Sequence, residues 1–65
     1  MNIVLNGESR TIEASSVADL IQALGYAGKR VAIERNGEIV PRSAHQHTLI
    51  ADGDRLEIVV AVGGG

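Results

Sequence analysis

The sequence RLEIVVAV at residues 55–62 first alternates charged with apolar residues and then becomes continuously apolar. The alternation predicts a strand, and we expect Leu56, Ile58 and Val60 to face a core. Val59 then lies on the opposite face. Residues 2–6, NIVLN, alternate in the same way. Because strands this apolar usually lie in the middle of a sheet, we expect these two strands to be central and parallel neighbours.

Two Asn-Gly pairs predict two β-hairpins. A type I′ turn needs positive φ at both central residues, which Asn and Gly tolerate well. Asn6-Gly7 joins the first strand to a second one, in which we expect Ile12 to face inward. Asn36-Gly37 joins the two strands of the other hairpin, and a two-residue turn fixes their register. The four expected hairpin strands are residues 2–6, 10–13, 31–35 and 38–40.

One short helix is predicted between the hairpins. Ser16 is placed to cap its free N–H groups, and Gly25 provides the left-handed residue at which helices often end. The expected helix has only about two turns, so it must pack on a sheet to be stable. Its apolar residues recur at helical spacing and are Val17, Leu20, Ile21 and Leu24.

The predicted element order is β-β-α-β-β-β. One helix covers only one face of a sheet, so the architecture is α+β, with a mixed sheet of about five strands and the helix on one side. Together with parallel first and last strands, this order predicts the β-grasp, or ubiquitin-like, fold. We expect the domain to span residues 1–62 and a flexible glycine tail to occupy residues 63–65.

The composition excludes several kinds of function. The chain has 65 residues, a net charge of -2, no cysteine and a single aromatic residue, Tyr26. Without a basic run or a set of aromatic residues, nucleic-acid binding is not expected. No apolar stretch is long enough to cross a membrane, and the first seven residues lack the features of a signal peptide. We therefore expect a cytoplasmic protein with no membrane contact.

Residues 42–48 are polar and predict a solvated loop. His45 and His47 could suggest a metal site, but two histidines without a neighbouring carboxylate or thiol seldom bind a metal, so we predict none. Asp52 and Asp54 flank a glycine and are interpreted as turn formers. Lys29, the only lysine, could accept a conjugated carboxylate, but a solvated residue is the simpler interpretation.

The sequence ends in Val62-Gly63-Gly64-Gly65, directly after the predicted core strand. Three glycines form a segment with no side chains, which can be threaded into a narrow cleft so that a terminal carboxylate reaches a reaction centre. The alternative interpretation is a frayed end.

Motifs along the whole chain resemble those of the ThiS family, the sulfur carriers of thiamine (thiazole) biosynthesis. The segments that carry the resemblance are residues 1–8, 17–20, 35–43, 52–59 and 63–65. The terminal glycines alone are less specific, since other ubiquitin-like carriers share them. The middle and C-terminal segments are specific in combination.

The resemblance implies a chemical role for the glycine tail. An E1-like, ThiF-like adenylyltransferase would use ATP to adenylate the carboxylate of Gly65. Sulfur from a persulfide donor would then give a thiocarboxylate, and a ThiG-like thiazole synthase would accept that sulfur. Gly63 and Gly64 would provide access to the active sites of the partners. The chain itself would be a carrier with no catalytic residue and no bound cofactor.

The sheet face opposite the helix is the predicted docking surface. Exposed apolar side chains that gather on one face are typical of a protein-binding patch, although small proteins always expose some apolar residues. The candidate docking residues are Val4, Ile39, Val59, Ala61 and Val62.

Three alternatives share parts of this pattern. The first is a MoaD-like sulfur carrier of molybdopterin synthesis, whose relatives tend to be longer and richer in aromatic residues. The second is a ubiquitin-like modifier that forms isopeptide bonds with protein lysines. The third is an interaction domain whose glycine tail is inert.

Overall fold

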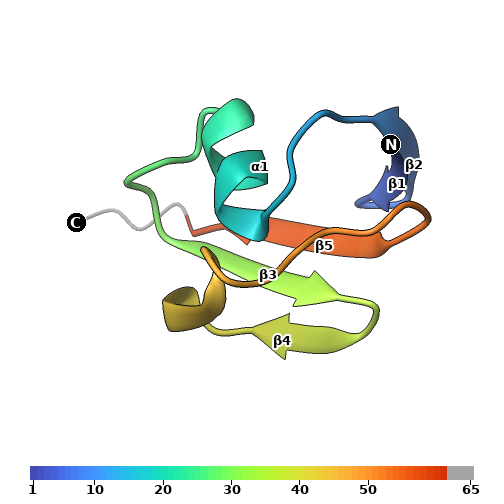
Figure 1. Cartoon of the computed structure of the whole chain (residues 1–65). Helices are drawn as coiled ribbons and strands as arrows, with labels where there is room; N and C mark the ends of the chain where they lie inside the picture. The colour runs from blue at the N-terminus through green and yellow to red at the C-terminus, as the bar shows by residue number, and fades with distance from the viewer. Residues whose placement is uncertain (62–65) are drawn as a thin grey trace.

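The computed structural model describes residues 1–61, which form one five-stranded sheet, one α-helix and one turn of 3-10 helix (Figure 1). The predicted docking residue Val62 and the three tail glycines lie outside the described residues, as does the predicted boundary between domain and tail. The elements in chain order are β1 (Asn2–Leu5), β2 (Glu8–Thr11), α1 (Val17–Ala23), β3 (Val31–Arg35), β4 (Glu38–Val40), the 3-10 helix η1 (Arg42–Ala44) and β5 (Arg55–Val60).

The order of strands across the sheet is β2-β1-β5-β3-β4, so β5 is the central strand. It pairs in parallel with β1 and antiparallel with β3. The prediction that the first and last strands are parallel neighbours inside the sheet is therefore confirmed. In the second hairpin Ile33 pairs with Val40, as the two-residue turn required.

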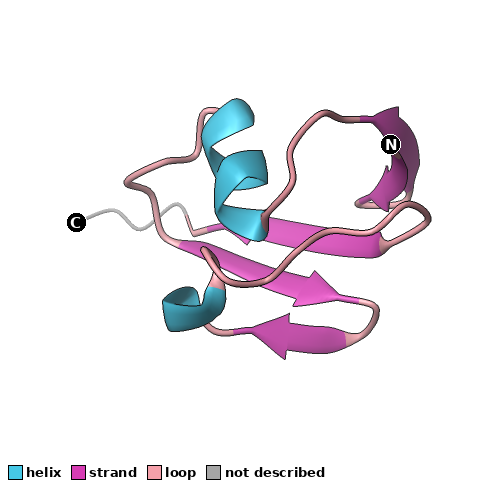
Figure 2. Ribbon diagram, in the orientation of Figure 1, coloured by secondary structure: helices cyan, strands magenta, loops and turns pink. Residues whose placement is uncertain are grey.

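Helix α1 packs on one face of the sheet, where it buries Val17, Leu20 and Ile21 (Figure 2). Its first turn is capped as predicted: the Ser16 hydroxyl accepts a hydrogen bond from the Asp19 N–H at 3.1 Å. The core also contains inward-facing residues of four strands and of the loop before β5. These further core residues and their partly buried neighbours are Ile3, Leu5, Ile33, Ile50, Leu56, Ile58, Val31 and Val40.

Strand β2 begins earlier than the sequence predicted, at Glu8 instead of residue 10, and it ends at Thr11. The reason is the turn itself. Asn6 and Gly7 both have positive φ, at 50° and 83°, so the loop has only two residues and Glu8 pairs at once with Leu5. Ile12 lies beyond the strand but still packs against the core, half-buried.

The segment predicted as a solvated loop is more ordered than expected. Residues Arg42–Ala44 form η1, and the chain then buries His45, whose exposed fraction is 7%. The His45 carbonyl accepts a hydrogen bond from the Ala18 N–H at 2.9 Å, and its ring Nε2 lies 3.2 Å from the Val40 carbonyl. This histidine therefore links the 42–48 segment to α1 and β4, whereas His47 is exposed as expected.

Candidate functional site

The sheet face opposite α1 carries three of the predicted docking residues. Ile39 and Val59 are 78% and 65% exposed, while Val4 is half-buried. Their place on this face follows from the register, because Ile39 pairs with exposed Glu34 and Val4 pairs with exposed Arg55. Ile3, Leu5, Val40 and Ile58, which adjoin them in their strands, belong to the core or pack against it. The structure therefore exposes Ile39 and Val59 on this face, and their role in docking stays a prediction.

Ala61 continues directly from β5 and is also exposed. Its N–H donates a hydrogen bond to the carbonyl of Arg30, the residue before β3, at 2.9 Å. The sequence then runs through Val62 into the three glycines. In the sequence, the glycines therefore begin two residues after Ala61, the last residue that the structure describes.

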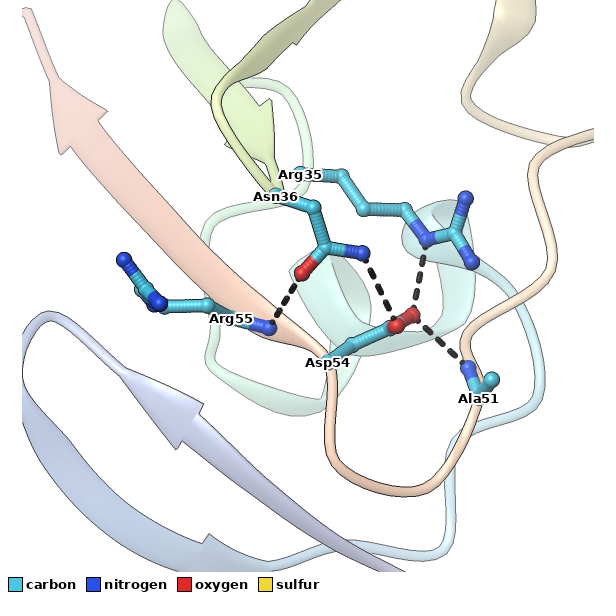
Figure 3. Close-up of polar contacts among 5 residues, drawn as sticks. All are labelled: Arg35, Asn36, Ala51, Asp54 and Arg55. Carbon is cyan, nitrogen blue, oxygen red and sulfur yellow. Dashed lines mark hydrogen bonds and ion pairs between the residues drawn. The ribbon is translucent and has the colours of Figure 1, made fainter.

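The start of β5 is held by a buried carboxylate that sequence reasoning interpreted only as a turn former (Figure 3). Asp54 is 7% exposed. Its Oδ2 accepts hydrogen bonds from Arg35 Nε at 2.7 Å and from the Ala51 N–H at 2.8 Å. Its Oδ1 accepts one from Asn36 Nδ2 at 3.0 Å. The Asp54 side chain therefore joins its own turn to the end of β3 and the Asn36 turn, beside the first residue of β5.

These contacts favour the ionised form of Asp54. Burial is the largest single influence and raises the pKa of its carboxyl group, but the hydrogen bonds from Ala51, Arg35 and Asn36, with the charge of Arg35, outweigh it. The pKa therefore lies below its ordinary value of 3.8. The sequence signal for this cluster was weak, because Arg35 approaches Asp54 only through the pairing of β3 with β5, which places Arg35 opposite Leu56.

A hollow of about 420 Å³ lies between α1, the loop before β3 and the segment around η1. Lys29 and Arg42 are on its lining, and the Lys29 ammonium is 6.0 Å from the centre of the Tyr26 ring. Within residues 1–61 every buried side-chain nitrogen or oxygen has a hydrogen-bond partner, so no such atom is left free to bind a ligand there.

Neither a metal site nor a membrane-crossing helix is found within residues 1–61. No three histidine, cysteine or carboxylate side chains of that part gather as metal ligands would. None of its helices is long and apolar enough to cross a membrane.

The sequence matches known proteins over its whole length. The sequence model of the ThiS family matches residues 3–65. A thiazole synthase of Paramagnetospirillum magneticum is 48% identical to it over 100% of this chain, although the chain spans only 20% of that relative. The sulfur carrier protein ThiS of Bacillus subtilis is 34% identical over 82% of this chain and 80% of that protein.

The fold has a close counterpart among solved structures. The crystal structure of the thiamine biosynthesis protein ThiS from Geobacter metallireducens superimposes with a TM-score of 0.83. It is 36% identical, and the match covers 100% of both chains. This similarity confirms the predicted β-grasp fold. Since sequence and fold agree over nearly all residues, the chain belongs to the ThiS family of sulfur carrier proteins.

Proposed function

We propose that this protein carries sulfur as a thiocarboxylate on Gly65 and delivers it to a thiazole synthase in thiamine biosynthesis. The observation that carries the proposal is the direct join between the central strand and the glycines. Ala61, the residue after β5, is hydrogen-bonded to Arg30, the residue before β3, and the glycines follow after one further residue in the sequence. A rigid domain with a short glycine extension can dock on a partner and present its terminus in a narrow active site.

The proposed activation makes the terminal carboxylate reactive. One oxygen of the Gly65 carboxylate attacks the α-phosphorus of ATP, pyrophosphate leaves, and an acyl-adenylate remains. The terminal sulfur of a persulfide then attacks the acyl carbon and AMP leaves. A second thiol cleaves the resulting sulfur–sulfur bond and frees the thiocarboxylate. In this scheme an E1-like adenylyltransferase and a persulfide donor perform the chemistry, and the carrier is their substrate. It needs no bound cofactor of its own.

The similarity to a thiazole synthase supports the proposed acceptor. In Paramagnetospirillum magneticum a segment matching this whole chain makes up 20% of a protein named thiazole synthase. A carrier and its acceptor enzyme that share one chain have an effective concentration higher than two separate proteins reach. We propose that the same two activities meet here through docking on the open sheet face. Because activation consumes ATP, we place the reaction in the cytoplasm.

The test is ATP–pyrophosphate exchange with the adenylyltransferase of the same organism. The intact mass of the purified 65-residue chain first verifies that Gly65 bears a free carboxylate. We expect exchange that requires the carrier and is lost when Gly65 is deleted, while the circular dichroism spectrum is unchanged. Exchange that survives the deletion would contradict the proposed role of the Gly65 carboxylate. A second arm adds lysine-containing acceptor proteins, and isopeptide products there would favour the modifier alternative.

A further inference from the structure

We infer that Glu34 and Glu57, side by side on the open sheet face, receive a basic side chain of the adenylyltransferase when it covers this face. The inference rests on the proposed function and deepens it, because it states the chemistry of the partner surface. It starts from the register of β3 on β5, in which Glu34 and Glu57 are direct partners. Both side chains are exposed.

Like charges directly opposite each other on a sheet face destabilise the pair of strands. Nothing in the described part of the chain neutralises this pair with a direct contact, since its one ion pair joins Arg35 to Asp54. Arg55 lines the same shallow hollow of about 70 Å³ together with both glutamates, but it makes no ion pair with either. Two carboxylates and one guanidinium leave this hollow with an excess negative charge.

Apolar side chains flank the two carboxylates. On one side Glu34 pairs with Ile39 in β4, and two residues further along β5 from Glu57 lies Val59. Opposite Val59 is exposed Ala32 of β3. The face therefore combines a central acidic pair with an apolar border. A partner surface that fits it has a basic side chain surrounded by apolar ones.

Docking changes the energetics of the acidic pair. In the free protein, water screens the repulsion between Glu34 and Glu57 only in part. When a partner covers apolar neighbours such as Ile39 and Val59, water leaves the face. Two carboxylates without a cation beside them would then raise the free energy of the complex. A guanidinium or ammonium group placed between them removes that cost. The acidic pair thus selects partners with a matching cation and speeds their approach.

The test compares Glu34→Gln/Glu57→Gln with the control Glu8→Gln. Glu8 is an exposed carboxylate of β2 that pairs with core-facing Leu5, so its substitution changes the charge away from the open face. Unfolding in urea and stopped-flow association with the adenylyltransferase are measured at low and high salt. The double variant should unfold at a higher urea concentration than wild type and associate about three- to tenfold more slowly at low salt. High salt should reduce both the gain in stability and the loss in association rate. Glu8→Gln should show neither of these two changes.

The outcomes separate this inference from the function on which it rests. If wild type does not associate with the adenylyltransferase, the proposed function fails, and the docking inference fails with it. If wild type associates and the double variant does so at the same rate with the same salt dependence, only the basic-partner inference is overturned. A double variant that binds more tightly than wild type would also overturn it, because the face would then prefer an uncharged surface.

Discussion

Asn6 and Asn36 occupy equivalent positions in two different hairpin turns and bind the same strand from its two sides. The Asn6 N–H donates to the Leu56 carbonyl at 2.9 Å, and the Asn36 N–H donates to the Arg55 carbonyl at 2.7 Å. Each side-chain Oδ1 then accepts a hydrogen bond from a β5 N–H, that of Ile58 for Asn6 and that of Arg55 for Asn36.

The side-chain amide of Asn6 also bonds β5 in the way that the backbone of a further β1 residue would. Its Nδ2 donates to the Ile58 carbonyl at 3.2 Å, while its Oδ1 accepts from the Ile58 N–H at 2.8 Å. A side-chain amide has the same donor and acceptor as a peptide group, so the Asn6 side chain extends the hydrogen bonding between β1 and β5 one step beyond the end of β1. Both hairpins thus anchor the strand from which the glycine tail extends.

Asn36→Ala should lower the free energy of unfolding by about 2–3 kcal/mol, because it removes two side-chain hydrogen bonds. It also places alanine at φ 52°, a backbone conformation that alanine tolerates less well than asparagine. Asn36→Gly keeps the positive φ accessible and should cost only about 1–2 kcal/mol. Urea unfolding measures both. Equal effects of the two substitutions would show that the hydrogen bonds, not the backbone conformation, explain the asparagine.

The ionised state of Asp54 should make stability depend on pH in acid. Its pKa is lower in the folded protein than the ordinary 3.8, so the folded state holds the carboxylate more strongly than the unfolded chain does. The resulting stability is fully present above about pH 4 and is lost as pH falls through the folded pKa.

The variant Asp54→Asn isolates this contribution. It should unfold more easily at neutral pH by roughly 3 kcal/mol, since Arg35 loses its charged partner. Its stability should also fall less steeply than that of wild type as the pH drops from 5 to about 2. Glu13→Gln, at an exposed position, is the control for a simple change of charge. If the stability of Asp54→Asn fell as steeply with decreasing pH as that of wild type, the pH dependence could not be attributed to Asp54.

The open face should matter for partner recognition more than for stability. Ile39→Ser and Val59→Ser change exposed side chains, so each should cost less than about 1 kcal/mol of folding free energy. Each should raise the apparent KM of the adenylyltransferase for the carrier about tenfold, because covered apolar side chains contribute to docking. Leu49→Ser is the matched control. Leu49 is 68% exposed, and its backbone forms an isolated β-bridge with Ser16, the residue before α1. A similar rise in KM for Leu49→Ser would remove the special role of the open face.

The glycines should be needed for access and not for folding. Gly64→Val adds a branched side chain to the segment that we propose enters the active site of the partner, whereas wild type has no side chain there. We expect adenylation to slow by about 100-fold or more, with an unchanged unfolding transition. The measurement is pyrophosphate release, with Ala27→Val, which adds a branched side chain at an exposed position of the domain, as a comparison. Adenylation of Gly64→Val at the wild-type rate would exclude a narrow access path.

Local signals were enough to predict most of the fold. The Asn36-Gly37 pair is enough to predict the register of the second hairpin, and the apolar spacing around Leu20 predicts the helix. The second strand was predicted two residues too late, at residue 10, because a prediction from the pattern of residues 10–13 ignores the two-residue loop that Asn6-Gly7 forms. The core side of each strand was correct wherever apolar and charged residues alternate, as in β5.

The polar contacts were harder to predict because they join residues distant in sequence. Asp54 looks like a turn former until β3 is placed beside β5, which brings Arg35 and Asn36 to it. His45 looks solvated until η1 turns it toward α1. Likewise the facing pair Glu34 and Glu57 follows only from the strand register. Charged residues gave correct local predictions but little information on their partners.

Intact-protein mass spectrometry tests the central claim most directly. The 65-residue chain is incubated with the adenylyltransferase, ATP and a persulfide donor, and its C-terminal peptide is then analysed. Our account predicts a mass gain equal to the replacement of one oxygen by one sulfur, located at Gly65 and absent from a chain that lacks Gly65. An unchanged mass, with an adenylyltransferase that is shown to be active on another carrier, would contradict sulfur carriage by this protein.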